Sequence, residues 1–153
     1  MKILMVCLGN ICRSPMAHGL LRDKVQELEV ETDSAGTSSY HLDEAPDPRM
    51  IKTGREYGIN ISDLRGRQFK VEDFDYFDKI YVMDHSNFQN VVALARHEAD
   101  RAKVSLILNE LEPDSNSEVP DPYFGGDRGF EDVYNLLDRA TDRIVEKIKH
   151  GQL

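Results

Sequence analysis

Short apolar runs alternate with segments of helical periodicity along most of this 153-residue chain. Four segments predict strands: a short buried one at residues 2–6, and three others at 30–37, 79–84 and 103–108. In four other segments apolar residues recur at steps of three or four, which predicts helices over residues 14–28, 46–58, 86–95 and 129–151. Regular alternation favours a parallel sheet with helices on both faces, because right-handed crossovers place each helix over the sheet. We therefore expect an α/β fold, a three-layer sandwich whose four-stranded parallel sheet is flanked by helices.

Local signals mark the ends of three of these helices. Ser14 is expected to cap the first helix, with Pro15 at its first position. Ser86 is the expected cap of the third helix, and Gly58 is expected to end the second. The first helix should extend to about Leu28, so that one apolar face packs on the sheet.

The length of the chain suits one globular unit, and we expect a single domain over residues 1–153. No stretch of about 18 uncharged apolar residues could span a bilayer, and the first residues lack the apolar region of a signal peptide. We therefore expect a cytoplasmic protein without membrane partners, as a monomer or with weak self-association. The formal net charge of −9 argues against nucleic acid as a partner, because binding to phosphate backbones needs clustered lysine and arginine.

The chain has two cysteines, Cys7 and Cys12, in C-x4-C spacing. Two thiols are too few for a structural zinc site and fit reduced cysteines better than a disulfide framework. We expect neither a metal ion nor another cofactor, and a chemical role for at least one thiol. Four histidines lack the spacing of metal ligands and are expected at the surface: His18, His85, His97 and His150.

The segment CLGNICRSP, residues 7–15, joins the first predicted strand to the first predicted helix. Gly9 and Asn10 are the residue types that most readily accept left-handed backbone angles, so this turn can direct successive amides inward. At a helix N-terminus such amides form a cradle for a tetrahedral anion, and Arg13 would add a two-pronged donor for phosphate oxygens. The same positive field favours the thiolate of Cys7, which could attack a phosphate bound above it.

Each of these residues alone has an ordinary explanation: Cys7 as a core thiol, Gly9 and Asn10 as a plain turn, and Arg13 as a solvated residue at a helix start. Their combination within nine residues favours a phosphate-binding loop after the first strand. The role of Cys12 stays open, since it could fill space beneath the loop or trap oxidised Cys7 in a reversible disulfide.

The loop closely resembles that of the low-molecular-weight protein tyrosine phosphatases, whose signature is C-x-G-N-x-C-R-S at the N-terminus. Further segments match the same family: SAGT at 34–37, His41 with PDPR at 46–49, ISDLRGRQF at 61–69, MDHSN at 83–87 and VPDPYFGG at 119–126. The resemblance covers nearly the whole chain. It implies an enzyme that hydrolyses phosphotyrosine in protein substrates through a cysteinyl-phosphate intermediate, without a metal ion.

The resemblance also assigns the chemical steps. Cys7 would attack phosphorus, Arg13 would clamp the phosphate oxygens, and Asp121 would protonate the departing phenolate and then take a proton from water. A proton donor makes sense independently, because a phenolate whose conjugate acid has a pKa of ~10 leaves slowly at neutral pH. Pro122 biases Asp121 toward an extended backbone, which could direct the carboxyl group inward.

By the same resemblance, further residues hold the substrate and the loop. The substrate would contact the loop residues Leu8, Gly9, Asn10, Ile11, Cys12 and Ser14. Ser14 would also stabilise the thiolate, and Asn10, tied to Ser34, would hold the loop's shape. Tyr40 and Tyr123 would lie on opposite walls of a deep cleft and sandwich the aromatic ring. Tyr123 also matches a tyrosine that is phosphorylated in some relatives.

Three other functions remain as alternatives. Phosphoarginine phosphatases, a close relative, tend to carry threonine where Ile11 stands, and an isoleucine favours an aromatic ring over a guanidinium. Thioredoxin-linked arsenate reductases share the fold and a similar loop, but their disulfide relay needs further cysteines after Cys12. A phosphotyrosine-binding module without turnover would need neither Cys7 nor Asp121.

Overall fold

The computed structural model describes residues 1–124 and 127–153, so Gly125 and Gly126 of the VPDPYFGG segment lie outside the described residues. Its centre is a four-stranded parallel sheet in the order β2-β1-β3-β4. The strands are β1 (Lys2–Cys7), β2 (Glu31–Gly36), β3 (Lys79–Val82) and β4 (Val104–Leu106). The predicted parallel sheet is confirmed, and β1 lies inside it with a neighbour on each edge.

Both faces of the sheet are buried at β1, which explains why residues 3–7 of this strand are apolar without alternation. On β1, Ile3 and Met5 point into the core on one face, whereas Leu4 and Val6 belong to the core on the other. The pairing of β1 with β2 runs in register from Lys2 opposite Glu31 to Cys7 opposite Gly36. The carboxyl ends of these two strands therefore meet at one edge of the sheet.

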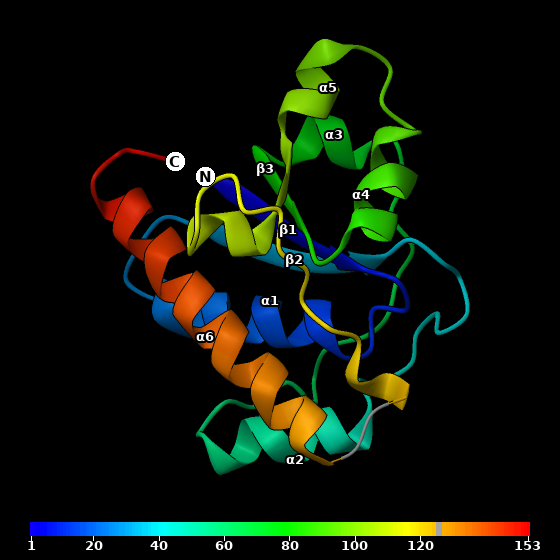
Figure 1. Cartoon of the computed structure of the whole chain (residues 1–153), viewed down its shortest axis with the longest axis vertical. Helices are drawn as coiled ribbons and strands as arrows, with labels where there is room; N and C mark the ends of the chain where they lie inside the picture. The colour runs from blue at the N-terminus through cyan, green and yellow to red at the C-terminus, as the bar shows by residue number, and fades with distance from the viewer. Residues whose placement is uncertain (125–126) are drawn as a thin grey trace.

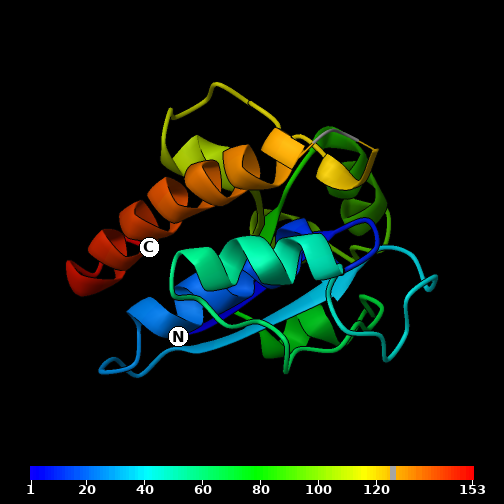
Figure 2. The same cartoon turned by 90° about the horizontal axis from the view of Figure 1, so that it is seen from below.

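Helices form a layer on each face, as Figure 1 shows. One layer holds α1 (Arg13–Lys24) and α6 (Asp127–Lys149), with α2 (Pro48–Glu56) packed beside α6. The other holds α3 (Asp73–Tyr76), α4 (His85–Val92) and α5 (Glu98–Ala102). Two short 3-10 helices follow, η1 (Ile107–Glu110) and η2 (Pro122–Phe124). Figure 2 shows α2 on the side of α1 that faces away from the sheet. The three-layer sandwich is confirmed.

The first helix differs from its prediction at both ends. It begins at Arg13, so Ser14 is its second residue rather than its cap, and it ends at Lys24 rather than near Leu28. The Ser14 hydroxyl does not cap the helix because it accepts a hydrogen bond from Asn10 and contacts the sulfur of Cys7. A residue of the helix start is thus turned toward the loop.

The caps of α2 and α4 are both aspartates. Asp84 caps α4 by accepting a hydrogen bond from the Asn87 amide at 2.8 Å, so the prediction of a Ser86 cap is wrong. Asp47 caps α2 in the same manner, and Gly58, with φ +82°, follows the end of that helix as predicted. The helices α3 and α5 were missed, because four or five residues are too few to show helical periodicity.

His18 is buried, contrary to its expected surface position. Every residue from Arg13 to Leu21 is buried, because α1 is covered by the sheet on one side and by segment 59–61 on another. Gly19 permits this cover, since a Cβ there would approach the Cγ2 of Ile61 to 2.4 Å. Among the helices of residues 1–124 and 127–153, none is long and apolar enough to cross a membrane.

Candidate active site

The loop between β1 and α1 lies at the carboxyl end of β1, where ligands bind in open α/β sheets. Asn10 has φ 58°, the left-handed conformation expected of this turn. Neighbouring segments hold the loop carbonyls: the amides of Thr37, Ser38 and Asp47 donate to the carbonyls of Cys7, Leu8 and Ile11 at 2.9, 3.0 and 2.8 Å. The loop is therefore held on its outer side by main-chain hydrogen bonds from both ends of the connection between β2 and α2.

A chain of buried side-chain hydrogen bonds ends at the sulfur of Cys7. The amide nitrogen of Asn10 donates to the Ser14 hydroxyl at 2.8 Å, and that hydroxyl lies 3.1 Å from Cys7 Sγ. Because Ser14 accepts from Asn10, its own hydrogen can be donated either to a sulfur anion at Cys7 or to the Ala35 carbonyl, which lies 3.4 Å away. This contact is the one expected of a residue that stabilises a thiolate.

The outer end of Asn10 has a different partner from the expected Ser34. Its side-chain oxygen accepts from the Arg67 amide at 3.0 Å, whereas the Ser34 hydroxyl lies 3.1 Å from Nδ1 of His18. Burial lowers the pKa of His18 to about 4, so this histidine is neutral at pH 7. Ser34 thus belongs to a hydrogen bond between β2 and α1 behind the loop.

Arg13 is almost completely buried, although it carries a charge. Its Nη1 donates to Asp84 at 2.8 Å and to the Val119 carbonyl at 3.0 Å, and its Nη2 lies 3.6 Å from Asp121. Burial lowers the pKa of Arg13, but Cys7 and the hydrogen-bonded Asp84 outweigh it and leave the pKa above its ordinary value. The guanidinium is therefore held charged in a fixed orientation beside the loop.

Two residues that bond to the side chains of Asn10 and Arg13 were not predicted from the sequence, Asp84 and Arg67. Asp84 is the last residue of the predicted strand 79–84, and the carboxyl ends of neighbouring parallel strands meet at one edge, so its position beside Arg13 could have been inferred. Arg67 reaches Asn10 through its main chain, and a main-chain donor leaves no signal in residue type.

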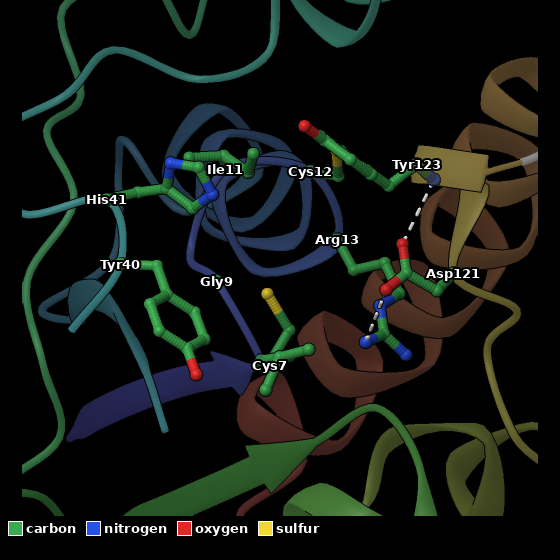
Figure 3. Close-up of a pocket in the computed structure, with 10 residues that line it drawn as sticks. Cys7, Gly9, Ile11, Cys12, Arg13, Tyr40, His41, Asp121 and Tyr123 are labelled. Atoms are coloured by element: carbon green, nitrogen blue, oxygen red, sulfur yellow. Dashed lines mark hydrogen bonds and ion pairs between the residues drawn. The ribbon is translucent and has the colours of Figure 1, made fainter. Parts of the chain in front are cut away.

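A cavity of about 270 Å³ opens above the loop. It is lined by Cys7, Leu8, Gly9, Ile11, Cys12, Arg13, Tyr40, His41, Asp121 and Tyr123. In Figure 3 the sulfur of Cys7 faces the space between Tyr40 on one side and Asp121 on the other. Nine of these ten residues were expected at the site. The tenth, His41, was noted in the sequence only within a segment that matches the family, without a role at the site. Asn10, Ser14 and Ser34 are not among the residues that line the cavity.

Asp121 lies across the cavity from the loop. One carboxylate oxygen accepts a hydrogen bond from the Tyr123 amide at 3.0 Å, and the other faces Arg13 (Figure 3). About a third of the Asp121 side chain is exposed, so water can reach it. The carboxyl group is placed where it could exchange a proton with a bound molecule and with solvent.

The second thiol differs from the first in its surroundings. Both cysteines are free thiols, and both are buried. Burial raises the pKa of Cys12 above its ordinary value, and the negative charge of Asp47 adds to this. Cys12 is therefore a neutral thiol, and the disulfide considered for it stays a prediction.

The arrangement joins a thiol, an arginine and a carboxyl group around one cavity. A sulfur anion could attack a tetrahedral anion that Arg13 orients, and Asp121 could protonate the group that leaves. Such a reaction requires no metal ion, since a guanidinium and main-chain amides can neutralise the phosphate charge. Within residues 1–124 and 127–153, no cluster of three or more metal-binding side chains was found.

Comparison with known proteins gives one consistent family. The family described as "Low molecular weight phosphotyrosine protein phosphatase" matches residues 2–152. The low molecular weight phosphotyrosine protein phosphatase of Schizosaccharomyces pombe is 40% identical over 152 residues, covering 96% of each chain. A crystal structure of a protein tyrosine phosphatase from Entamoeba histolytica, with Hepes in the active site, has a TM-score of 0.92 at 37% identity, covering 100% of this chain and 99% of that one. Vibrio vulnificus Wzb in complex with benzylphosphonate has a TM-score of 0.85 at 26% identity, covering 95% and 97% of the two chains.

Proposed function

The chain belongs to the low molecular weight phosphotyrosine protein phosphatases, and we propose on this basis that it hydrolyses phosphotyrosine in proteins with Cys7 as the nucleophile. The observation that carries the assignment of Cys7 is its sulfur, which lines the cavity 3.1 Å from the Ser14 hydroxyl. The buried guanidinium of Arg13 lies beside the same cavity. Cys12 lines the same cavity, but burial raises its pKa and keeps it a neutral thiol.

In the first step the thiolate of Cys7 attacks phosphorus, and the bond from phosphorus to the phenolic oxygen of the substrate breaks. Asp121 gives its proton to that oxygen, so the product leaves as neutral tyrosine. Arg13 binds two of the oxygens that remain on phosphorus. The products of this step are the free tyrosine side chain, a cysteinyl-phosphate and an ionised Asp121.

In the second step a water molecule attacks the cysteinyl-phosphate. The Asp121 carboxylate takes a proton from this water, the sulfur–phosphorus bond breaks, and inorganic phosphate leaves. The thiolate of Cys7 and the protonated Asp121 are restored. The partial exposure of Asp121 supports this double role, because the group needs contact with water between the two steps.

Aromatic substrates suit the rim of the cavity. Tyr40 and Tyr123 both line it, and Ile11 adds apolar surface near the loop. Wzb, a solved relative, binds benzylphosphonate, which joins an aromatic ring to a phosphonate group. A nucleophilic thiol also needs reducing conditions, so we propose that the enzyme acts in the cytoplasm.

The test is a parallel assay of phosphate release from a phosphotyrosine peptide, a phosphoserine peptide and phosphoarginine, without added metal. We expect phosphotyrosine to be the preferred substrate and Cys7→Ser to lower the rate at least about 10,000-fold. Arg55→Ala, an exposed change on α2 away from the cavity lining, serves as the control and should keep wild-type activity. Faster release from phosphoarginine would instead assign the enzyme to that substrate, and tight binding of the phosphotyrosine peptide without release would indicate a binding module.

A further inference from the structure

Arg49, the second residue of α2, contacts the segment that carries Asp121. Its Nη2 donates to the carbonyl of Tyr123 at 3.3 Å. Its guanidinium carbon also lies 5.5 Å from the centre of the Tyr123 ring and 4.6 Å from the centre of the Phe130 ring. One side chain of α2 therefore holds the main chain and the ring of Tyr123 against the start of α6.

Asp47 fixes the direction of this arginine. The Nε of Arg49 donates to one oxygen of Asp47 at 3.0 Å, and Nη2 donates to the other at 2.8 Å. These hydrogen bonds hold the pKa of Asp47 below its ordinary value, so the pair is ionic at neutral pH. The Asp47 side chain is 7% exposed, whereas that of Arg49 is 47% exposed. The buried Asp47 carboxylate thus anchors the half-exposed Arg49 side chain, which we call the anchor and the arm of this pair.

The anchor is attached to the phosphate-binding loop. The amide of Asp47 donates to the carbonyl of Ile11 at 2.8 Å. At the other end of the arm, the amide of Tyr123 donates to the carboxylate of Asp121 at 3.0 Å. A continuous series of contacts therefore runs from the loop at Ile11, through Asp47 and Arg49, to the carboxyl group of Asp121.

We propose that Arg49 is a positioning residue for the general acid, an inference that rests on the function proposed above. It holds residues 121–123 at a fixed height above the phosphate-binding loop, so that the carboxyl group of Asp121 reaches the oxygen of the leaving group. Proton transfer needs a heavy-atom separation of roughly 2.6–3.2 Å, and a small displacement of the segment removes it. Arg49 touches neither the phosphate nor the leaving group in this role.

The test measures kcat/KM for two aryl phosphates whose leaving groups differ in their need for a proton. Nitrophenolate leaves readily without protonation, whereas phenolate does not, and kcat/KM reports only the steps up to loss of the phenol. We expect Arg49→Ala to lower kcat/KM about tenfold or more for phenyl phosphate and about twofold for p-nitrophenyl phosphate. Arg55→Ala, on the same helix and also exposed, should leave the ratio of the two values unchanged.

Repeating the Arg49→Ala change in a variant that lacks the general acid distinguishes loss of positioning from general damage to the site. In Asp121→Asn enzyme there is no acid to position, so adding Arg49→Ala should change the ratio no further. Arg49→Lys keeps the charge but loses the fork that grips Asp47, and it should restore only part of the ratio. Arg49 is half-exposed, so folding of each variant is checked by its thermal transition.

Two results would overturn the proposal. One is an equal loss for both substrates in Arg49→Ala and in Arg49→Lys, and the other is a change of the ratio that persists in Asp121→Asn enzyme. Failure of the proposed function has a separate signature, because the wild-type enzyme would then release phosphate from neither aryl phosphate, and the positioning role would fall with it.

Discussion

The base of the cavity and its rim are built in opposite ways. At the base, Asn10, Arg13 and Ser14 are at most 3% exposed, and each makes hydrogen bonds to residues of the loop or of other strand ends. At the rim, Tyr40 is 80% exposed and Tyr123 is 41% exposed. The groups that would support the nucleophile and bind the phosphate are thus enclosed, and the groups that would meet the substrate's ring face solvent.

This difference follows from what each half has to do in the proposed reaction. Charges that develop on phosphorus and sulfur are stabilised most by donors that are already oriented and shielded from water. A rim that admits a protein substrate has to stay open, and the water that attacks the cysteinyl-phosphate has to reach Asp121. We therefore expect changes at the base to lower activity on every substrate, and changes at the rim to depend on the substrate.

The largest expected effect is that of Arg13→Lys. Lysine keeps the charge but has one point donor in place of a planar fork, so it cannot serve Asp84 and two phosphate oxygens together. We expect kcat/KM to fall about 100- to 1,000-fold on both phenyl phosphate and p-nitrophenyl phosphate. Arg22→Lys, which alters the exposed pair with Asp63 on the same helix, should change it less than about twofold. If Arg13→Lys kept most of its activity, the base would be as tolerant as the rim.

The burial of His18 behind the phosphate-binding loop can be tested through the stability of the protein at acid pH. The pKa of His18 is about 4 in the folded protein, below its ordinary value of 6.5, because burial disfavours the charged form. Between these pH values the unfolded chain binds a proton that the folded chain does not. The contribution is therefore fully present above pH 6.5 and is lost as the pH falls toward 4, by up to about 3 kcal/mol.

His18→Gln removes this titration and keeps a side chain that can bond to Ser34. Urea unfolding at pH 7, 5.5 and 4 should show that the wild-type protein loses more free energy of unfolding than the variant as the pH falls. The carboxyl groups are common to both proteins, so the difference between the two curves isolates His18. Parallel curves between pH 6.5 and 4 would mean that His18 is accessible to water in the folded protein.

The same residues show what could be predicted from the sequence. The strands, their shared carboxyl edge and the turn at Gly9 and Asn10 are encoded in runs of a few residues, and their arrangement was predicted. His18 is expected at the surface because it lacks the spacing of a metal ligand, whereas the fold encloses α1 along its first nine residues. The hydrogen bond from Arg13 to Asp84 joins residues 71 positions apart in the sequence. It becomes apparent only when the carboxyl ends of β1 and β3 are placed side by side in the sheet.

Ser14→Ala should have a smaller effect than Arg13→Lys. It removes the hydroxyl 3.1 Å from Cys7 and leaves the Asn10 amide without its acceptor inside the protein. We expect kcat/KM to fall about 10- to 100-fold by the same factor on phenyl phosphate and p-nitrophenyl phosphate. Ser38→Ala is a matched control, because its exposed hydroxyl bonds to the Leu8 carbonyl, which also receives the Ser38 amide. A loss restricted to phenyl phosphate would place Ser14 functionally with the acid rather than with the nucleophile.

The smallest expected effect is that of Tyr40→Ala at the rim. This ring is 80% exposed, so its removal leaves no cavity in the core and should not alter the thermal transition. Its loss should raise KM for a phosphotyrosine peptide about threefold to fivefold through lost aromatic contact, with kcat nearly unchanged. Tyr40→Phe keeps the ring and should behave as wild type, and inhibition by inorganic phosphate, which has no ring, should be equal in all three proteins. A fall in kcat, or weaker inhibition by phosphate, would show that the rim also shapes the base, because a residue that touches only the substrate's ring cannot change how the loop binds phosphate.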